Sequence, residues 1–249
     1  MIVANWKCNG SRAMLDEWVR SYLNEKDIQL DNSCLVLIAP PSVFFNELSD
    51  KISKNNINIF LCSQDIAGMT RKHTGAISGE LLIEMNVDKF CILGHSERRL
   101  FYKEDNQIIK DKVVECFQNK INPILCVGET EGENSLANTK EMIEKQLRIF
   151  ENESISEGTT IAYEPVWAIG TGKTPNPKDV NEIHKFIKDV VQSSSLNSLN
   201  PKVLYGGSVS EKNAKQFFSE EFVDGALIGG ASLDGASFAK IVNIKNGMK

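Results

Sequence analysis

The chain has 249 residues, of which 41% are hydrophobic, and it carries a formal net charge of −5. This length fits two small domains or one large one, and α/β barrels often reach it as a single domain. The negative charge argues against nucleic acid or an anionic membrane as a general partner. No apolar run approaches the roughly 18 residues of a membrane span, and the opening residues lack the pattern of a signal peptide. We therefore expect a cytoplasmic protein without membrane contact.

Eight short apolar runs recur along the chain and alternate with segments of helical periodicity. The runs cover residues 2–4, 34–39, 59–62, 90–93, 124–127, 160–163, 203–205 and 226–228. Helical spacing of apolar residues is clear within 14–23, 109–117, 180–191 and about 232–246. Strands that alternate with helices predict a parallel sheet, and unbroken apolar runs suit strands covered on both faces.

These patterns predict that residues 1–249 form a single-domain (β/α)₈ barrel, with eight parallel strands inside a ring of helices. The alternative is an open, doubly wound sheet. The six cysteines include no C-x-x-C pair, and four lie in the apolar runs. We expect them to be free thiols, most of them buried, rather than disulfides or zinc ligands.

The residues that follow the predicted strands are the candidates for a functional site, because ligands bind at the carboxyl ends of parallel strands. Glu164 ends a strand at Pro165, and its apolar neighbours would raise its basicity, which suits a general base. The alternative for Glu164 is a helix cap or an ion-pair partner. His95 stands between a strand and a predicted helix that begins at Ser96. A helix N-terminus disfavours imidazolium, so His95 could donate or relay a proton, or could merely cap the turn.

Lys7 and two glycine pairs are candidates for holding an anion. Lys7 follows the first strand, where its charge could hold a phosphate or an oxyanion, although most lysines are only solvated surface groups. The motifs "YGGS" (205–208) and "IGGAS" (228–232) follow the last two strands. Their glycines could let backbone N–H groups approach a phosphate, or could simply make tight turns. The stretch "GTGKT" is not a Walker A loop, and no metal-ligand spacing is present.

Five motifs together resemble the triosephosphate isomerase family over essentially the whole chain: "NWK.NG", "GHSERR", "YEPVWAIGTGK", "YGGSV" and "IGGASL". The resemblance implies an enzyme that interconverts dihydroxyacetone phosphate and D-glyceraldehyde 3-phosphate through an enediol(ate), in glycolysis and gluconeogenesis, with no metal or organic cofactor. A catalytically silent phosphate-binding barrel and another phosphosugar enzyme, such as an epimerase, are the alternatives. Retention of Glu164, His95 and Lys7 together argues against the first, and the absence of the metal ligands that many epimerases use argues against the second.

The resemblance also implies a role for each site residue. Glu164 would move the proton between the two carbons, His95 would be the neutral electrophile, and Lys7 would stabilise the enediolate. Asn5 would position Lys7, Glu97 would partner it, and the Ser96 hydroxyl would hold the base before closure. The phosphate contacts would come from Gly170, Ser208, Gly229 and Gly230, in addition to Asn5 and Lys7. The lid and clamp would comprise Pro165, Val166, Trp167, Ala168, Ile169, Gly170, Thr171, Gly172, Lys173 and Leu227.

Family members form homodimers through the loop after the third strand, and the resemblance places Thr74 and Gly75 in such an interface. Ala76 stands where the family usually has glutamate, and Cys8 where it usually has methionine. Both departures fall at the expected interface and bear on its strength.

Overall fold

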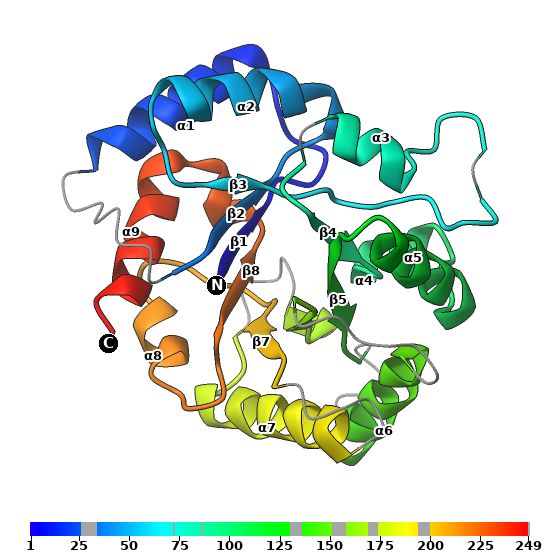
Figure 1. Cartoon of the computed structure of the whole chain (residues 1–249). Coiled ribbons are helices and arrows are strands. Elements are labelled where there is room, and N and C mark those ends of the chain that lie inside the picture. Colours follow the sequence, from blue (N-terminus) through cyan, green and yellow to red (C-terminus); the bar gives the residue numbers. More distant parts are fainter. Residues whose placement is uncertain are drawn as a thin grey trace.

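The structure is a computed structural model that describes residues 1–25, 34–71, 73–85, 87–129, 136–150, 158–168, 174–193 and 200–248. Eight parallel strands form the centre of the molecule and helices surround them (Figure 1). The strands are β1 (Ile2–Asn5), β2 (Val36–Ala39), β3 (Phe60–Leu61), β4 (Phe90–Leu93), β5 (Asn122–Val127), β6 (Thr160–Tyr163), β7 (Lys202–Tyr205) and β8 (Gly225–Ile228). The predicted barrel is therefore confirmed, and the open sheet was the wrong alternative.

The sheet closes on itself between its two terminal strands. Its order is β3-β2-β1-β8-β7-β6-β5-β4. Just beyond β3, the N–H of Ser63 donates to Phe90 O (2.9 Å), and the N–H of Ile92 donates to Ser63 O (2.8 Å). These two bonds join the end of β3 to β4, so no long strand edge is left open between them.

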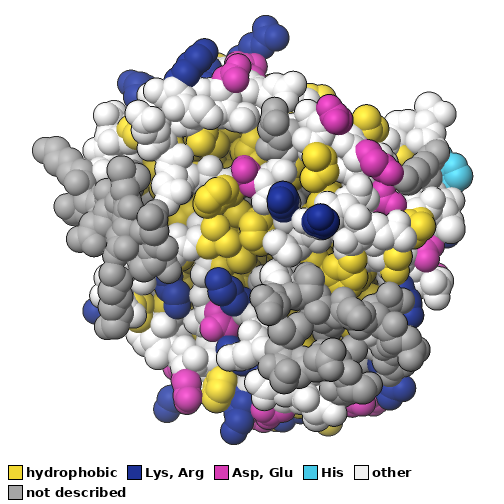
Figure 2. All heavy atoms as spheres, in the orientation of Figure 1, with side chains coloured by type: hydrophobic (Ala, Val, Ile, Leu, Met, Phe, Trp, Pro, Cys, Tyr) yellow, Lys and Arg dark blue, Asp and Glu magenta, His cyan; other side chains and the backbone are white. Residues whose placement is uncertain are grey.

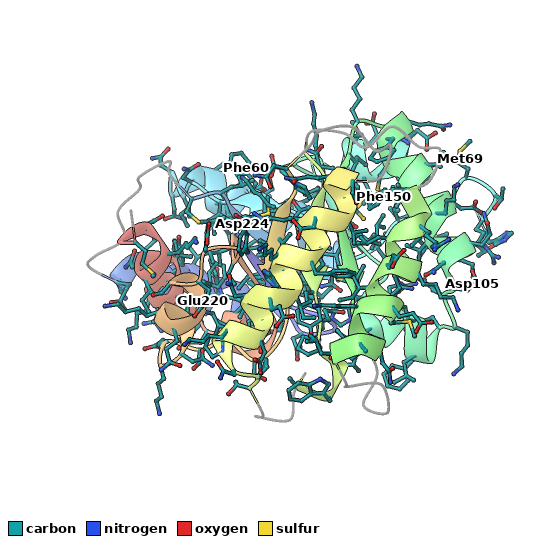
Figure 3. The ribbon with its side chains drawn as sticks, turned by 90° about the horizontal axis from the view of Figure 1, so that it is seen from below. Phe60, Met69, Asp105, Phe150, Glu220 and Asp224 are labelled. Atoms are coloured by element: carbon teal, nitrogen blue, oxygen red, sulfur yellow. The ribbon has the colours of Figure 1, made fainter. Side chains whose placement is uncertain are left out.

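Nine α-helical segments of the described chain lie around this barrel. They are α1 (Arg12–Asn24), α2 (Phe45–Lys54), α3 (Gly79–Glu84), α4 (Ser96–Phe101), α5 (Asn106–Gln118), α6 (Leu136–Leu147), α7 (Pro177–Ser193), α8 (Ala214–Phe218) and α9 (Gly235–Asn246). Figure 3, which views the molecule from below, shows α7 crossing in front of the barrel with α6 beside it. Local sequence sets several helix starts: Ser11, Asp105 and Asp234 each accept a backbone N–H three residues later. In the described ranges, no helix combines the length and apolar content that a membrane crossing requires.

Successive strand residues alternate between two cores. Ile2 and Ala4 pack outward under the helices, whereas Val3 points into the barrel. The inner core consists of Met1, Val3, Leu37, Ala39, Cys62, Ile92, Ile124, Cys126, Ala162, Leu204 and Leu227. Because these side chains fill the barrel, its interior is packed and the functional groups can gather only at its ends.

The barrel presents one end to the viewer in Figure 2, which shares the orientation of Figure 1. Hydrophobic side chains gather near the centre of that face, with lysine or arginine side chains beside them.

The prediction of free and mostly buried thiols is confirmed. All six cysteines are free; Cys62, Cys91, Cys116 and Cys126 are buried, Cys34 is half-buried and Cys8 is exposed.

Candidate active site

A cavity of about 340 Å³ lies at the carboxyl ends of the strands. It brings together eight of the residues predicted from the sequence, which come from the two ends of the chain and its middle. These are Asn5, Lys7, His95, Glu164, Ser208, Leu227, Gly229 and Gly230. The barrel thus places a carboxylate, an imidazole, an ammonium group and two glycine turns around one space.

Glu164 is fixed at the end of β6 by its backbone and by its carboxylate. Its N–H donates to Val127 O (2.7 Å), which extends the pairing with β5 by one residue. The residue is only 2% exposed, and its Oε2 accepts the backbone N–H of Ser96 (2.9 Å). A Cβ on Gly206 would lie 2.8 Å from Cγ of Glu164, so a side chain there would press against this carboxylate where β7 ends.

His95 is held as a neutral imidazole with a defined tautomer. It caps α4, and its Nδ1 accepts the N–H of Glu97 (3.2 Å). Since Nδ1 must then offer its lone pair, the ring proton is on Nε2. That atom lies 3.1 Å from Oε1 of Glu164, within hydrogen-bond distance. The site therefore pairs an N–H donor with a buried carboxylate.

Lys7 is turned toward the cavity by a strained backbone and is oriented by two neighbours. Its φ is +51°, which is uncommon for a residue with a side chain. Asn5 Oδ1 accepts the N–H of Lys7 (3.0 Å), and Nζ of Lys7 lies 2.6 Å from Oε1 of Glu97. Glu97 does not line the cavity; it contributes by holding Lys7.

The two glycine turns complete the cavity on the side of β7 and β8. A Cβ on Gly230 would meet no atom within 4 Å, so the backbone there faces open space. A Cβ on Gly229 would lie 3.6 Å from Cε of Lys7, which places the lysine stem beside this turn. The indole N–H groups of Trp6 and Trp18 both donate to Ser232 O (3.2 and 2.9 Å), which fixes the short 3₁₀ helix that follows. Exposed backbone next to an ammonium group suits an anionic ligand.

The segment after Glu164 begins as a 3₁₀ helix over Val166–Ala168. Trp167 Nε1 donates to Oε1 of Glu129 (2.9 Å), and the Ser208 hydroxyl donates to Ala168 O (2.9 Å). The start of the predicted lid is thereby attached to the end of β5 and to a cavity residue. The remaining lid residues, Ile169, Gly170, Thr171, Gly172 and Lys173, lie outside the described part of the chain.

Thr74 and Gly75 are not at this cavity. They are exposed, in the loop between β3 and α3 that extends away from the barrel in Figure 1. Gly75 lines a second cavity of about 420 Å³, together with Ala76, Arg98 and Tyr102. In Figure 3, Met69 of this loop and Asp105 lie on the same side of the molecule.

Gly206 and Gly207, the first of the two predicted glycine pairs, also line the cavity, whereas sequence reasoning did not single out Val209 and Ala231. Their signal was membership of the same two glycine motifs. The sequence analysis also treated the buried cysteines as core residues only. Burial raises the pKa of the Cys126 thiol well above its ordinary value, and the charge of Glu164 adds to that shift, so Cys126 lies close enough to feel the Glu164 carboxylate.

The fold and the site define a class: a (β/α)₈-barrel protein whose cavity, at the carboxyl ends of the strands, contains a buried carboxylate, a histidine and a lysine. The family model described as "Triosephosphate isomerase" matches residues 1–245. A triosephosphate isomerase of Buchnera aphidicola subsp. Cinara cedri is 39% identical over 251 residues, covering 99% of this chain and 98% of that protein. Those of Klebsiella pneumoniae and Enterobacter cloacae are 36% and 37% identical over 100% of this chain and 98% of theirs. The chain belongs to the triosephosphate isomerase family.

Proposed function

We propose that the protein interconverts dihydroxyacetone phosphate and D-glyceraldehyde 3-phosphate, as a cytoplasmic step of glycolysis and gluconeogenesis. The observation that carries this proposal is the 3.1 Å contact between Nε2 of His95 and Oε1 of Glu164 in the cavity that also contains Lys7. A base, a proton donor and a fixed positive charge around one space are what proton transfer next to a carbonyl requires.

The reaction follows from the atoms that face the cavity. The Glu164 carboxylate takes a proton from the carbon beside the carbonyl, and the electron pair of that C–H bond forms the enediolate double bond. The Nε2–H of His95 donates to the oxygens on which negative charge develops, and the ammonium group of Lys7 stabilises the same charge. His95 moves a proton from the hydroxyl oxygen to the former carbonyl oxygen, and Glu164 returns its proton to the other carbon, so that the carbonyl forms where the hydroxyl was. No electron leaves the substrate, so the residues present are sufficient for a redox-neutral step.

The phosphate of the substrate would lie against the glycine turns. Gly229 and Gly230 expose backbone beside Lys7, and Ser208 lies on the opposite turn. We assign Gly170 to the same phosphate and Ile169, with Leu227, to an apolar clamp over the base, on the family resemblance alone. Pro165 through Lys173 would act as a lid that excludes water from the enediolate.

The protein would act as a homodimer through the loop that carries Thr74 and Gly75. Support comes from apolar side chains that remain exposed on this loop and on α4: Met69 is 43% exposed, Leu100 53% and Phe101 69%. Tyr102 is 68% exposed and lines the 420 Å³ cavity with Gly75. Exposed apolar groups of this size on adjoining segments are typical of an association surface.

The test is an assay of the purified protein with dihydroxyacetone phosphate and with D-glyceraldehyde 3-phosphate, in buffer containing EDTA. We expect conversion in both directions with the chelator present, since in the described ranges no group of three histidine, cysteine or carboxylate residues could hold a metal. Binding of phosphate without turnover would instead indicate a silent barrel. Turnover that requires added metal would indicate another phosphosugar enzyme.

A further inference from the structure

Arg99 lies in α4, the helix that begins just after His95, but it does not line the substrate cavity. Its guanidinium makes three hydrogen bonds to neutral acceptors: Nε donates to Gly94 O (2.9 Å), Nη1 to Asn106 Oδ1 (2.8 Å) and Nη2 to Cys126 O (3.2 Å). These partners belong to the end of β4, the start of α5 and β5. No carboxylate of the described residues lies within ion-pair distance of Arg99.

Arg99 and Glu164 line the same cavity behind the base. This cavity, of about 210 Å³, also contains Ser96, Cys126 and Met142. Glu164 lines both this space and the substrate cavity, whereas Arg99 lines only the former. The arginine thus faces the side of Glu164 that is turned away from the substrate.

The charges around Glu164 balance only when Arg99 is included. The carboxylate is 2% exposed, and a buried anion is costly unless it is compensated. The positive charge of Lys7 is matched by Glu97, 2.6 Å away, and His95 is neutral because its Nδ1 accepts an N–H. Arg99 is the remaining cation near the described part of the site, and it has no anionic partner of its own.

The neighbours of Arg99 support the same assignment. Burial lowers the pKa of the Arg99 guanidinium, and the charges of Cys126, Glu164 and Glu104 act in the opposite direction. Cys126 stays neutral, since burial raises the pKa of its thiol. Glu104 already contacts two cations, Arg98 at 2.7 Å and Lys112 at 2.6 Å. Glu164 is therefore the anion in this group that lacks another charged partner.

We propose that Arg99 is a positioning residue for the isomerisation: its guanidinium is the counter-charge that keeps Glu164 ionised and seated against the N–H of Ser96. Its three hydrogen bonds hold the charge behind the base, and those to Gly94 O and Cys126 O also brace the Gly94–His95 turn against β5. Arginine suits this position because its planar fork is fixed by several acceptors while it remains charged. The assignment rests on the proposed function, in which Glu164 is the base.

The test compares Arg99→Gln with Arg99→Lys, which both keep a polar head but differ in charge. Loss of a nearby cation makes a carboxylate easier to protonate, so Arg99→Gln should move the acid limb of the kcat/KM profile to higher pH by about one unit. At a pH on that limb, kcat/KM should then fall about tenfold. Arg99→Lys should retain the wild-type limb, and Asn106→Ala, which removes one anchor without changing charge, should also leave it in place.

A second pair of variants leaves Arg99 intact, so this test works even if the Arg99 variants do not fold. Met142 lines the same cavity from α6 and is half-buried. Met142→Lys adds a cation there, and Met142→Gln is the matched neutral control. We expect the lysine variant to have its acid limb at lower pH than the glutamine variant.

The outcomes separate this proposal from the proposed function. A wild-type protein without isomerase activity would refute the function itself. If the wild type is active and Arg99→Gln has the same acid limb as wild type, the assignment of Arg99 alone is overturned. The same conclusion follows if Met142→Lys and Met142→Gln have the same acid limb. If Arg99→Gln lowers the unfolding midpoint but leaves the acid limb of kcat/KM unchanged, Arg99 has only a structural role.

Discussion

His95 and Glu164 are 69 residues apart in sequence, and their side chains meet at 3.1 Å across the end of the barrel. His95 follows β4 and Glu164 follows β6, with β5 between them. The N–H of Glu97 fixes the proton of His95 on the nitrogen that faces the carboxylate. The carboxylate of Glu164 and the Nε2 atom of His95 are thus set at adjacent positions by backbone elements, before any substrate contact contributes.

The buried His184 predicts a pH dependence of stability that is unrelated to catalysis. Burial lowers its pKa to about 4, and its Nδ1 contacts only the carbonyl of Phe222 at 3.2 Å among the described hydrogen bonds. The folded state favours the neutral ring, so its contribution is fully present above pH 6.5 and is lost as the pH falls toward 4. Over this window wild type should lose about 3 kcal/mol through this group.

His184→Gln should remove that part of the slope, as measured by denaturant unfolding at several pH values. The exposed His73 gives the control variant His73→Gln, which should keep the wild-type slope. Equal slopes in all three proteins would show that His184 does not titrate on unfolding.

Thr74→Arg tests the proposed dimer. The change places a charge in the middle of the expected interface, where it would have no partner and would weaken association. Analytical ultracentrifugation should show a dimer for wild type at micromolar concentration and a shift toward monomer for the variant. A fully active monomeric wild type would be incompatible with the interface on this loop.

Replacing residues 169–173 by a short glycine bridge tests the proposed lid. An enediolate exposed to water can expel phosphate, so the variant should isomerise slowly and release more inorganic phosphate per turnover. The measurement is the ratio of phosphate released to product formed, compared with wild type. The same ratio in both proteins would restrict this segment to substrate binding.

Much of the fold could be predicted because the strands are buried on both faces and read as unbroken apolar runs. All eight were found, although β2 begins at Val36, two residues after the start of its apolar run. The strand β3 has only Phe60 and Leu61, since the chain reaches β4 through the bridge at Ser63 instead of a longer ladder. Short helices such as α8, with five residues, carry too little periodicity to be read from spacing.

The members of the site were predictable, but its contacts were not. Strand-end motifs identified Glu164, His95 and Lys7, whereas their pairing depends on which strands are neighbours in the closed barrel. Ser96 was expected to hold Glu164 through its hydroxyl, while the hydrogen bond at 2.9 Å comes from its backbone N–H. A backbone group carries no residue-specific signal in a sequence. Arg99 could not be assigned either, because its effect depends on the charges that other residues leave unbalanced.

The most direct test of the account is the turnover of Glu164→Gln with both triose phosphates. The substitution keeps size and polarity but removes the base, so we expect kcat to fall by at least about 10²-fold. The variant should still bind inorganic phosphate, because the proposed phosphate contacts come from other residues, and should unfold cooperatively like wild type. Turnover near the wild-type rate in a folded Glu164→Gln protein would contradict the account.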